Sequence, residues 1–349
     1  MPGRATSPRS AVPRRCAVRQ DGTVVVAEHP SARRVTVAVP TFHRNAELRR
    51  LLTPLLPQLA ETAAGGEWDA EVLVIDNDPA GGGHVVADEL SPSADGRLRY
   101  VLEGTPGLAA VRNRALDEAD GRLLVFLDDD EEPAPDWLAT MLAMWTHHGS
   151  AAVFGRVVSV FEVERDAWLV AGRAFIRPAH RTGDRLPAVA TNNLLLDLDV
   201  VRRLSLRFDT RLAFSGGEDS LFTTQLTRGG GTILWCDEAV VYEHVPQDRL
   251  NRRWILTRAY RNGTVEETVA RLAGSGPAHA IRVRLQYLLG GVVRVVGGSG
   301  RVLLGRVTGK LTHVARGERA VARGAGMIAG AAGFVYQEYA KRTAARRAA

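Results

Sequence analysis

An apolar run that leads directly into a run of acids lies near the middle of the chain. Residues 123–127 are five apolar residues, and residues 128–132 are five consecutive acids. Such an apolar run, partly β-branched and aromatic, predicts a strand buried on both faces of a parallel sheet. The acids then emerge at its carboxyl end, where open α/β sheets place their ligand sites. Because adjacent carboxylates repel one another, we predict a divalent-metal site here; the alternative is a solvated acidic turn before a helix.

The residues before this run alternate between strand and helix patterns. Strands are predicted at 35–39, 71–75 and 98–102, and helices at 46–60, 85–90 and 107–119. Pro54 and Pro57 are expected to break or kink the first helix. Alternation at this spacing predicts an α/β fold, with a mostly parallel sheet, right-handed crossovers and flanking helices.

The pattern is looser after the acids. The expected elements, ending near His244, are a helix at 137–147, strands at 151–160 and 188–196, a helix at 219–228, and short strands at 232–235 and 239–242.

Charge and composition divide the 349 residues into three segments. Residues 249–349 hold 19 Lys and Arg against 4 Asp and Glu, and residues 1–34 hold 7 against 2. With a net charge of +6, residues 35–248 therefore carry −14. We predict a disordered basic segment at 1–33 with a short strand near 23–27, an α/β domain at 34–248, and a basic amphipathic helical region at 249–349.

Compartment and partners are constrained by three absences. Residues 1–34 lack the apolar h-region of a signal peptide, and no stretch offers about 20 consecutive apolar residues for a bilayer span. Cys16 and Cys236 form neither a disulfide framework nor a zinc pattern, which fits a reducing compartment. We expect a cytoplasmic protein without bound nucleic acid. Its basic helices either lie on the anionic inner face of the cell membrane or pack on the domain.

Four landmarks in order give the chain a family resemblance. They are Pro40-Thr41-Phe42-His43-Arg44 after the first strand, Asp76-Asn77-Asp78 after the second, Gly107 to Asn113 followed by Asp128 and Asp130, and Gly217-Glu218-Asp219 before a helix. In these features, over roughly residues 34–246, the chain resembles family 2 glycosyltransferases of the GT-A fold. The resemblance implies a mostly parallel Rossmann-like sheet and an inverting enzyme that uses a nucleotide-diphospho-sugar.

The resemblance also assigns roles to particular residues. Mg²⁺ or Mn²⁺ would be held by Asp128, Asp130 and His244. The nucleotide donor would be held by Pro40, Thr41, Arg44, Asp76, Arg112, Asn113, Asp128 and Asp129. A structural histidine, an Asx turn at Asp76 and a surface arginine are the alternatives to three of these roles.

Asp219 would be the base that deprotonates the acceptor hydroxyl, with Glu218 orienting the base or the acceptor. The alternative is that these acids cap the following helix, and the choice of base between them stays open. Asn192 and Asn193 are candidates for contacts with sugar hydroxyls; core or turn hydrogen bonding is the alternative.

We therefore expect a glycosyltransferase that acts on a glycan, a lipid-linked precursor or a small-molecule acceptor. One rival is a sugar-phosphate nucleotidyltransferase, which would need a Gly-rich phosphate loop after the first strand, where residues 39–45 contain no glycine. A second rival is a non-catalytic sugar-nucleotide-binding protein of the same fold.

Overall fold

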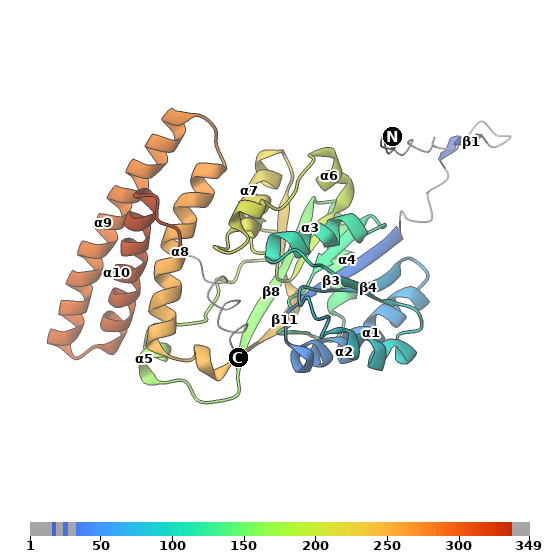
Figure 1. Cartoon of the computed structure of the whole chain (residues 1–349), viewed down its shortest axis with the longest axis horizontal. Helices are drawn as coiled ribbons and strands as arrows, with labels where there is room; N and C mark the ends of the chain where they lie inside the picture. Colours follow the sequence, from blue (N-terminus) through green and yellow to red (C-terminus); the bar gives the residue numbers. More distant parts are fainter. Residues whose placement is uncertain (1–15, 19–23, 27–32, 337–349) are drawn as a thin grey trace, which may run out of the picture.

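The computed structural model of the chain describes residues 16–18, 24–26 and 33–336 (Figure 1). Near the N-terminus, β1 (Cys16–Val18) and β2 (Val24–Val26) pair in antiparallel fashion, and β2 falls within the strand expected at 23–27. The disorder expected for residues 1–33 otherwise concerns residues that lie outside the described ones.

In the described part of the chain, one sheet has nine strands, in the order β5-β4-β3-β6-β10-β8-β11-β7 with β9 paired to β11. The first four in this order run parallel, as expected: β3 (Arg34–Thr41), β4 (Asp69–Asp76), β5 (Leu98–Leu102) and β6 (Leu123–Phe126). The others are β7 (Glu131–Pro133), β8 (Ala152–Phe161), β9 (Arg185–Leu186), β10 (Leu194–Asp197) and β11 (Ile233–Val245).

Antiparallel strands join the two parallel parts of this sheet. β10 lies antiparallel to both β6 and β8, whereas β8 and β11 are parallel to each other. The two short strands expected at 232–235 and 239–242 are one continuous strand, β11, because a register shift between Cys236 and Val240 accommodates the residues between them.

Helices cover both faces of the sheet. Alternate residues of β3 point to opposite faces, so Val35, Val37 and Val39 pack on one side and Ala38 on the other. The first face is covered by α1 (Asn45–Ala64), α2 (His84–Leu90) and α4 (Trp137–His148), and the second by α3 (Leu108–Glu118), α6 (Leu198–Arg203) and α7 (Glu218–Arg228).

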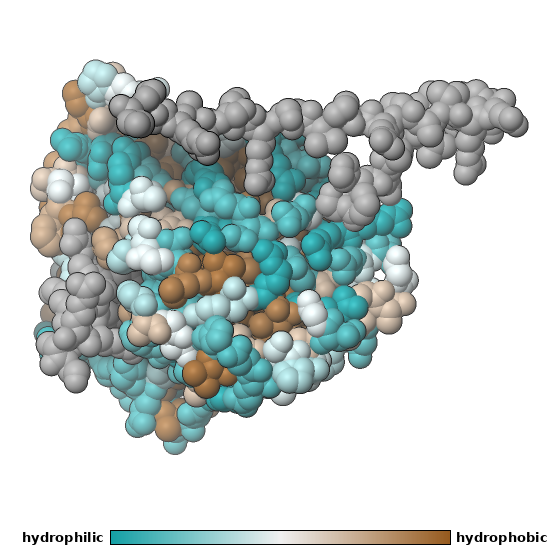
Figure 2. Space-filling view, turned by 45° about the vertical axis from the view of Figure 1, so that its right-hand side comes forward, coloured by the Kyte–Doolittle hydropathy of each residue, from teal (hydrophilic) through white to brown (hydrophobic). Residues whose placement is uncertain are grey.

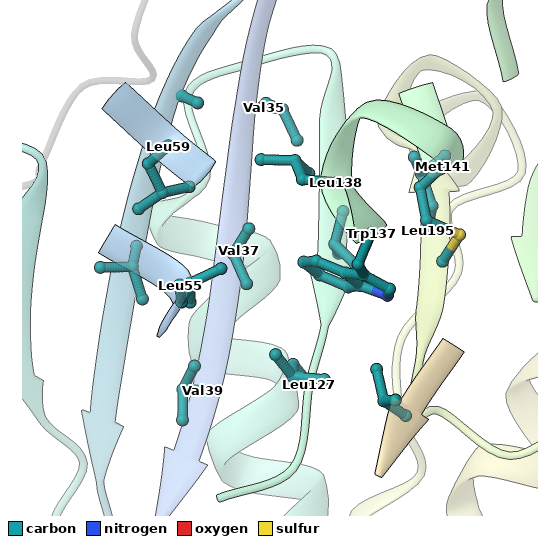
Figure 3. Packing of buried hydrophobic residues seen from close by; sticks show 14 of the residues in the cluster. Val35, Val37, Val39, Leu55, Leu59, Leu127, Trp137, Leu138, Met141 and Leu195 are labelled. Atoms are coloured by element: carbon teal, nitrogen blue, oxygen red, sulfur yellow. The ribbon is translucent and has the colours of Figure 1, made fainter. Parts of the chain in front are cut away.

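Trp137, the first residue of α4, is fully buried in the first face (Figure 3). Its ring lies among aliphatic side chains that include Val37, Leu127 and Leu195. Each such aliphatic side chain contributes about 1.5–3 kcal/mol when fully buried. The apolar face of the strands is therefore what holds α1 and α4 in place.

Of the break or kink expected at Pro54 and Pro57, the break is wrong. α1 continues through both prolines, which lie on its outer side, while six leucines are buried beneath them. Packing of the leucine face outweighs the local preference of proline.

Three long helices follow the sheet: α8 (Arg252–Leu272), α9 (Pro277–Thr308) and α10 (Leu311–Ala331). α10 packs between α8 and α9, and also contacts the short α5 (Ala167–Ala171), so α9 lies furthest from the sheet (Figure 1). Among the described helices, α9 is the one long and apolar enough to cross a membrane by length and composition. The expectation of no such segment counted only uninterrupted apolar residues.

Candidate active site

The carboxyl ends of three parallel strands bring the first predicted residues to one edge of the sheet. Thr41, at the end of β3, pairs in register with Asp76 at the end of β4. Ala38 pairs with Phe126, so β6 ends beside β3 and leads into Asp128 at the same edge. Parallel pairing therefore assembles residues that lie far apart in the sequence.

The acidic segment begins in a tight loop between β6 and β7 and continues into β7, which contains Glu131 and Glu132. Glu131 accepts from the backbone N–H of Asp128 at 3.1 Å, and its other oxygen accepts from Asn192 Nδ2 at 2.8 Å. The backbone N–H of His244 donates to the carbonyl of Asp130 at 2.9 Å. Pairing of β7 with β11 continues this contact. The backbone of the acids is thus held from two sides.

Two arginines form ion pairs with Asp129 and Asp130. Arg44 Nη1 donates to Asp129 Oδ1 at 2.6 Å and to Asp130 Oδ2 at 3.0 Å, and Thr41 Oγ1 donates to Asp129 Oδ2 at 3.0 Å. Arg249 Nη1 lies 3.6 Å from the same oxygen of Asp130. Both carboxylate oxygens of Asp129, which is predicted to contact the donor, thus accept hydrogen bonds from the end of β3 and the loop that follows it.

Burial makes these carboxyls weak acids. It raises the pKa of Asp128 to about 6 against the opposing field of Arg112, and the pKa of Asp129 to about 7 against that of Arg44. Burial, reinforced by Asp128, also raises the pKa of Glu131 well above its ordinary value. Since a cation favours the ionised form, a divalent ion bound here would release protons and relieve the repulsion.

The Asp76 side chain is fully buried, and its carboxylate accepts three hydrogen bonds. Its carboxylate accepts from the backbone N–H groups of Asp78 at 2.9 Å and Gly83 at 2.8 Å, and from the hydroxyl of Tyr100 at 2.9 Å. The bond to Asp78 is the Asx turn given above as the alternative to a nucleobase contact. A nucleobase role for Asp76 stays a prediction.

On the other side of the edge, α3 and α7 meet through a buried ion pair between Arg112 and Glu218. Burial raises the pKa of Glu218 to about 7, opposed by Arg112 and reinforced by Asp219. Arg112 also opposes the rise that burial causes in the pKa of Asp128. Arg112 thus links the acidic loop to the start of α7 and is not a surface residue.

Two glycines set the start of α7. Gly216 and Gly217 have φ angles of 78° and 94°, which favour glycine, and a Cβ on Gly217 would lie 2.4 Å from Val265 Cγ1 of α8. α8 therefore packs directly on the turn that presents Glu218 and Asp219. Asp219 is half-buried, and its Oδ1 accepts from the N–H of Ser220 at 2.6 Å.

Other predicted residues contact protein groups. Both ends of the Asn113 amide bond to the backbone of Phe208. His244 Nε2 lies 3.1 Å from Glu132 Oε2, while the backbone N–H of His244 contacts the carbonyl of Asp130. Asn193 is buried and bonded to Trp137, Arg156 and Ala239, so the structure gives it core hydrogen bonding rather than a sugar contact. Pro40 lies in β3 beside Ile75.

The described residues contain no group of three or more His, Cys, Asp or Glu side chains that would hold a metal ion by themselves. Asp128 and Asp130 still fit a divalent ion. Mg²⁺ in particular is held by one or two carboxylates together with the phosphates of a substrate. This donor set therefore suits a metal that binds with its substrate.

The sequence had assigned no role to three residues at this edge. Besides Arg249, these are Arg177, whose Nη2 donates to Glu243 Oε2 at 2.7 Å, and Glu131, which positions Asp128. Glu131 lies in the predicted acidic run and had a signal in its position. Arg177 and Arg249 lie in segments without a readable pattern, and only tertiary contacts identify them.

Comparison with known proteins places this geometry in a family. The model of glycosyl transferase family 2 matches residues 36–204. The succinoglycan biosynthesis protein ExoM of Rhizobium meliloti is 33% identical over 226 residues, 63% of this chain and 70% of that protein. The GalNAc(5)-diNAcBac-PP-undecaprenol beta-1,3-glucosyltransferase of Campylobacter jejuni is 30% identical over 124 residues, 35% of this chain and 37% of that protein.

A solved structure is similar over most of the chain. The mannosyltransferase PcManGT of Pyrobaculum calidifontis, in complex with GDP-Man and Mn²⁺, has a TM-score of 0.53 and 21% identity, covering 91% of this chain and 81% of its own. The family match counts against both rivals, the nucleotidyltransferase and the non-catalytic binding protein. The chain belongs to glycosyltransferase family 2 and is a glycosyltransferase with the GT-A fold.

Proposed function

We propose that this glycosyltransferase transfers a sugar from a nucleotide-diphosphate donor to a hydroxyl group of its acceptor, with inversion at the anomeric carbon. The observation that carries the proposal is the electrostatic link through Arg112 between the acidic loop and the Glu218–Asp219 pair. One group would hold the donor, and the other would activate the acceptor. We assign this chemistry to residues 34–248.

The donor would bind along the carboxyl edge of β3, β4 and β6. Asp128 and Asp130 would hold Mg²⁺ or Mn²⁺ together with the diphosphate, where the ion offsets the charge that grows as the sugar leaves. Arg44 and Arg249, now paired with Asp130, carry charge suited to phosphate oxygens once a cation takes over their carboxylate. His244 would join the metal after losing its contact with Glu132.

Asp219 would accept the proton of the attacking hydroxyl. It is half-buried at the start of α7, whereas Glu218 is buried and paired with Arg112. A general base must reach the proton that it removes, so the more accessible Asp219 suits that role and Glu218 suits orientation of the site. With one base and no covalent intermediate, direct displacement inverts the anomeric centre.

For the acceptor, we propose a lipid-linked glycan precursor at an anionic membrane surface. The Campylobacter jejuni relative is named for an undecaprenol-diphosphate-linked acceptor. Residues 249–349 carry 19 Lys and Arg against 4 Asp and Glu, a balance that suits anionic lipid headgroups.

The donor can be tested with a panel of UDP-, GDP- and TDP-sugars, each with Mg²⁺, with Mn²⁺ and with a chelator. We expect one sugar nucleotide to be hydrolysed slowly without acceptor, to release its nucleoside diphosphate, and to need the metal. Asp130→Asn should lower this rate by about 100-fold or more, because it removes a charged metal ligand. Asp88→Asn, a change of the same kind on the exposed surface of α2, should leave the rate unchanged. Metal-independent hydrolysis, or no binding of any sugar nucleotide, would contradict the proposal.

A further inference from the structure

The outer face of α9 is an exposed apolar stripe. At least two-fifths of each side chain is exposed for Leu285, Leu289, Val292, Val296, Leu303 and Val307. Intervals of three, four and seven residues place them along one side of a helix. By contrast, the apolar patches that Figure 2 shows on one face of the molecule are small and separated by hydrophilic surface. An exposed apolar stripe of this length, interrupted only by Ser299 and Gly300 between Val296 and Leu303, indicates a binding surface.

The opposite face of α9 is made of glycine and packs closely on α10. Gly291 and Gly298 approach Gly324 and Gly317, so that a Cβ on Gly298 would lie 2.9 Å from the carbonyl oxygen of Gly317. The backbones of the two helices are therefore in contact, with Val295 and Val302 packed beside the glycines, and the side chains of the stripe are left on the outside. The packing does not leave α9 free to turn its stripe inward.

Arginines border the stripe on both sides. By helical spacing, Arg306 borders the stripe on one side and Arg282 on the other, whereas Arg284, Arg294 and Arg301 lie nearer the face that packs on α10. α9 contains no Asp or Glu. An apolar face bordered by arginines suits the interface of an anionic bilayer, where the chains bury the apolar side chains and the guanidinium groups reach the headgroups.

We propose that α9 lies in the plane of an anionic lipid bilayer, with this stripe buried in the boundary between headgroups and acyl chains. The proposal deepens the proposed function and rests on it only for the identity of the acceptor. An orientation across the bilayer would place Arg294 near the middle of the acyl chains, which is costly. Pairing with a second copy would bring two helices together that carry arginines and no acids, whereas anionic lipid offsets this charge.

The test measures flotation of the full-length protein with vesicles of phosphatidylcholine, alone or mixed with phosphatidylglycerol. Val296→Glu introduces a charge into the stripe at a side chain that is 66% exposed, and Val85→Glu makes the same change on α2 at one that is 64% exposed. We expect the wild type to bind the mixed vesicles and Val85→Glu to match it. Val296→Glu should bind them at least about tenfold more weakly.

Three results would overturn the proposal. The first is that the wild type does not float with mixed vesicles, and the second is that Val296→Glu floats equally well. The third is that the wild type is a dimer in gel filtration with light scattering, that Val296→Glu is a monomer, and that neither binds vesicles, because a second copy would then cover the stripe. Metal-dependent hydrolysis of the sugar nucleotide, measured without vesicles on the same variants, separates failure of this inference from failure of the proposed function.

Discussion

Glu218 joins burial, an ion pair and a neighbouring acid in one side chain. Its carboxyl is buried against Arg112, and burial raises its pKa to about 7 despite that arginine. Below about pH 7 the carboxyl becomes neutral and no longer balances the charge of Arg112. Because Arg112 also acts on Asp128, protonation of Glu218 changes the field on the acidic loop as well.

We therefore predict an acidic limb in the pH profile of kcat/KM, with activity falling as pH falls through about 7. Folding stability should change in the opposite direction. A folded-state pKa raised above 4.5 stabilises the fold at low pH, and this contribution is lost as pH rises from about 4.5 through 7. The checks are a pH–rate series and urea unfolding at the same pH values.

Glu218→Gln should lower activity and remove the contribution of Glu218 to this limb, since glutamine does not titrate, while Asp128 and Asp129, whose pKa values burial raises to about 6 and about 7, still titrate. Asp219→Asn, which removes the proposed base, should lower kcat by about 10²–10⁴-fold at every pH. A profile for Glu218→Gln that keeps the limb unchanged would show that another group sets it. The reverse pattern of losses would make Glu218 the base.

At the scale of elements, α1 and the acidic loop show which structural features can be predicted from the sequence. Strand ends are local features, so residue type and position were enough to predict that the acids emerge at the carboxyl end of a parallel strand, and the structure confirms it for Asp128. The site roles of Thr41 and Asp76 came from the family resemblance, and the pairing of β3 with β4 brings these two residues together. The break expected at the prolines of α1 is absent because the local cost of proline is outweighed by burial of the leucines of α1 against the sheet.

Side-chain contacts between segments that are distant in the sequence could not be predicted from a sequence pattern. Arg249 and Asp130 are far apart in the sequence, and no periodicity connects them. The amides of Asn113 and Asn193 likewise have partners set by tertiary packing, and their backbone bonds could not be anticipated from a motif. Hydrogen bonding of this kind depends on which segments meet, which the fold decides.

Adjacent glycines in α9 offer a sharp test of its packing. Gly298→Ala should destabilise the protein by about 1–3 kcal/mol, because the added Cβ would press on the backbone of α10. Gly297→Ala, where a Cβ meets nothing within 4 Å, should stabilise it by up to about 1 kcal/mol through helix propensity. Urea unfolding followed by circular dichroism measures both. Equal shifts in the same direction would show that α9 is not packed on α10 through its glycine face.

At the scale of the whole molecule, charge is divided between an acidic body and a basic end. Residues 35–248 carry −14, and residues 249–349 carry +15. An anionic membrane would repel the first and attract the second, so the helices should turn toward the bilayer. This orientation agrees with the position of α9, the helix furthest from the sheet (Figure 1).

Salt dependence should therefore separate the two forces that bind the protein to vesicles. The Debye length falls from about 10 Å at 0.1 M salt to about 3 Å at 1 M, so binding to phosphatidylglycerol-containing vesicles should weaken steeply over this range. Binding to phosphatidylcholine alone should be weaker at low salt and nearly independent of salt, because only the apolar stripe contributes. Flotation over a salt series measures both curves. If salt weakens binding to both vesicle types equally, the charge division does not set the affinity. If it weakens neither, the apolar stripe of α9 binds lipid without help from its arginines.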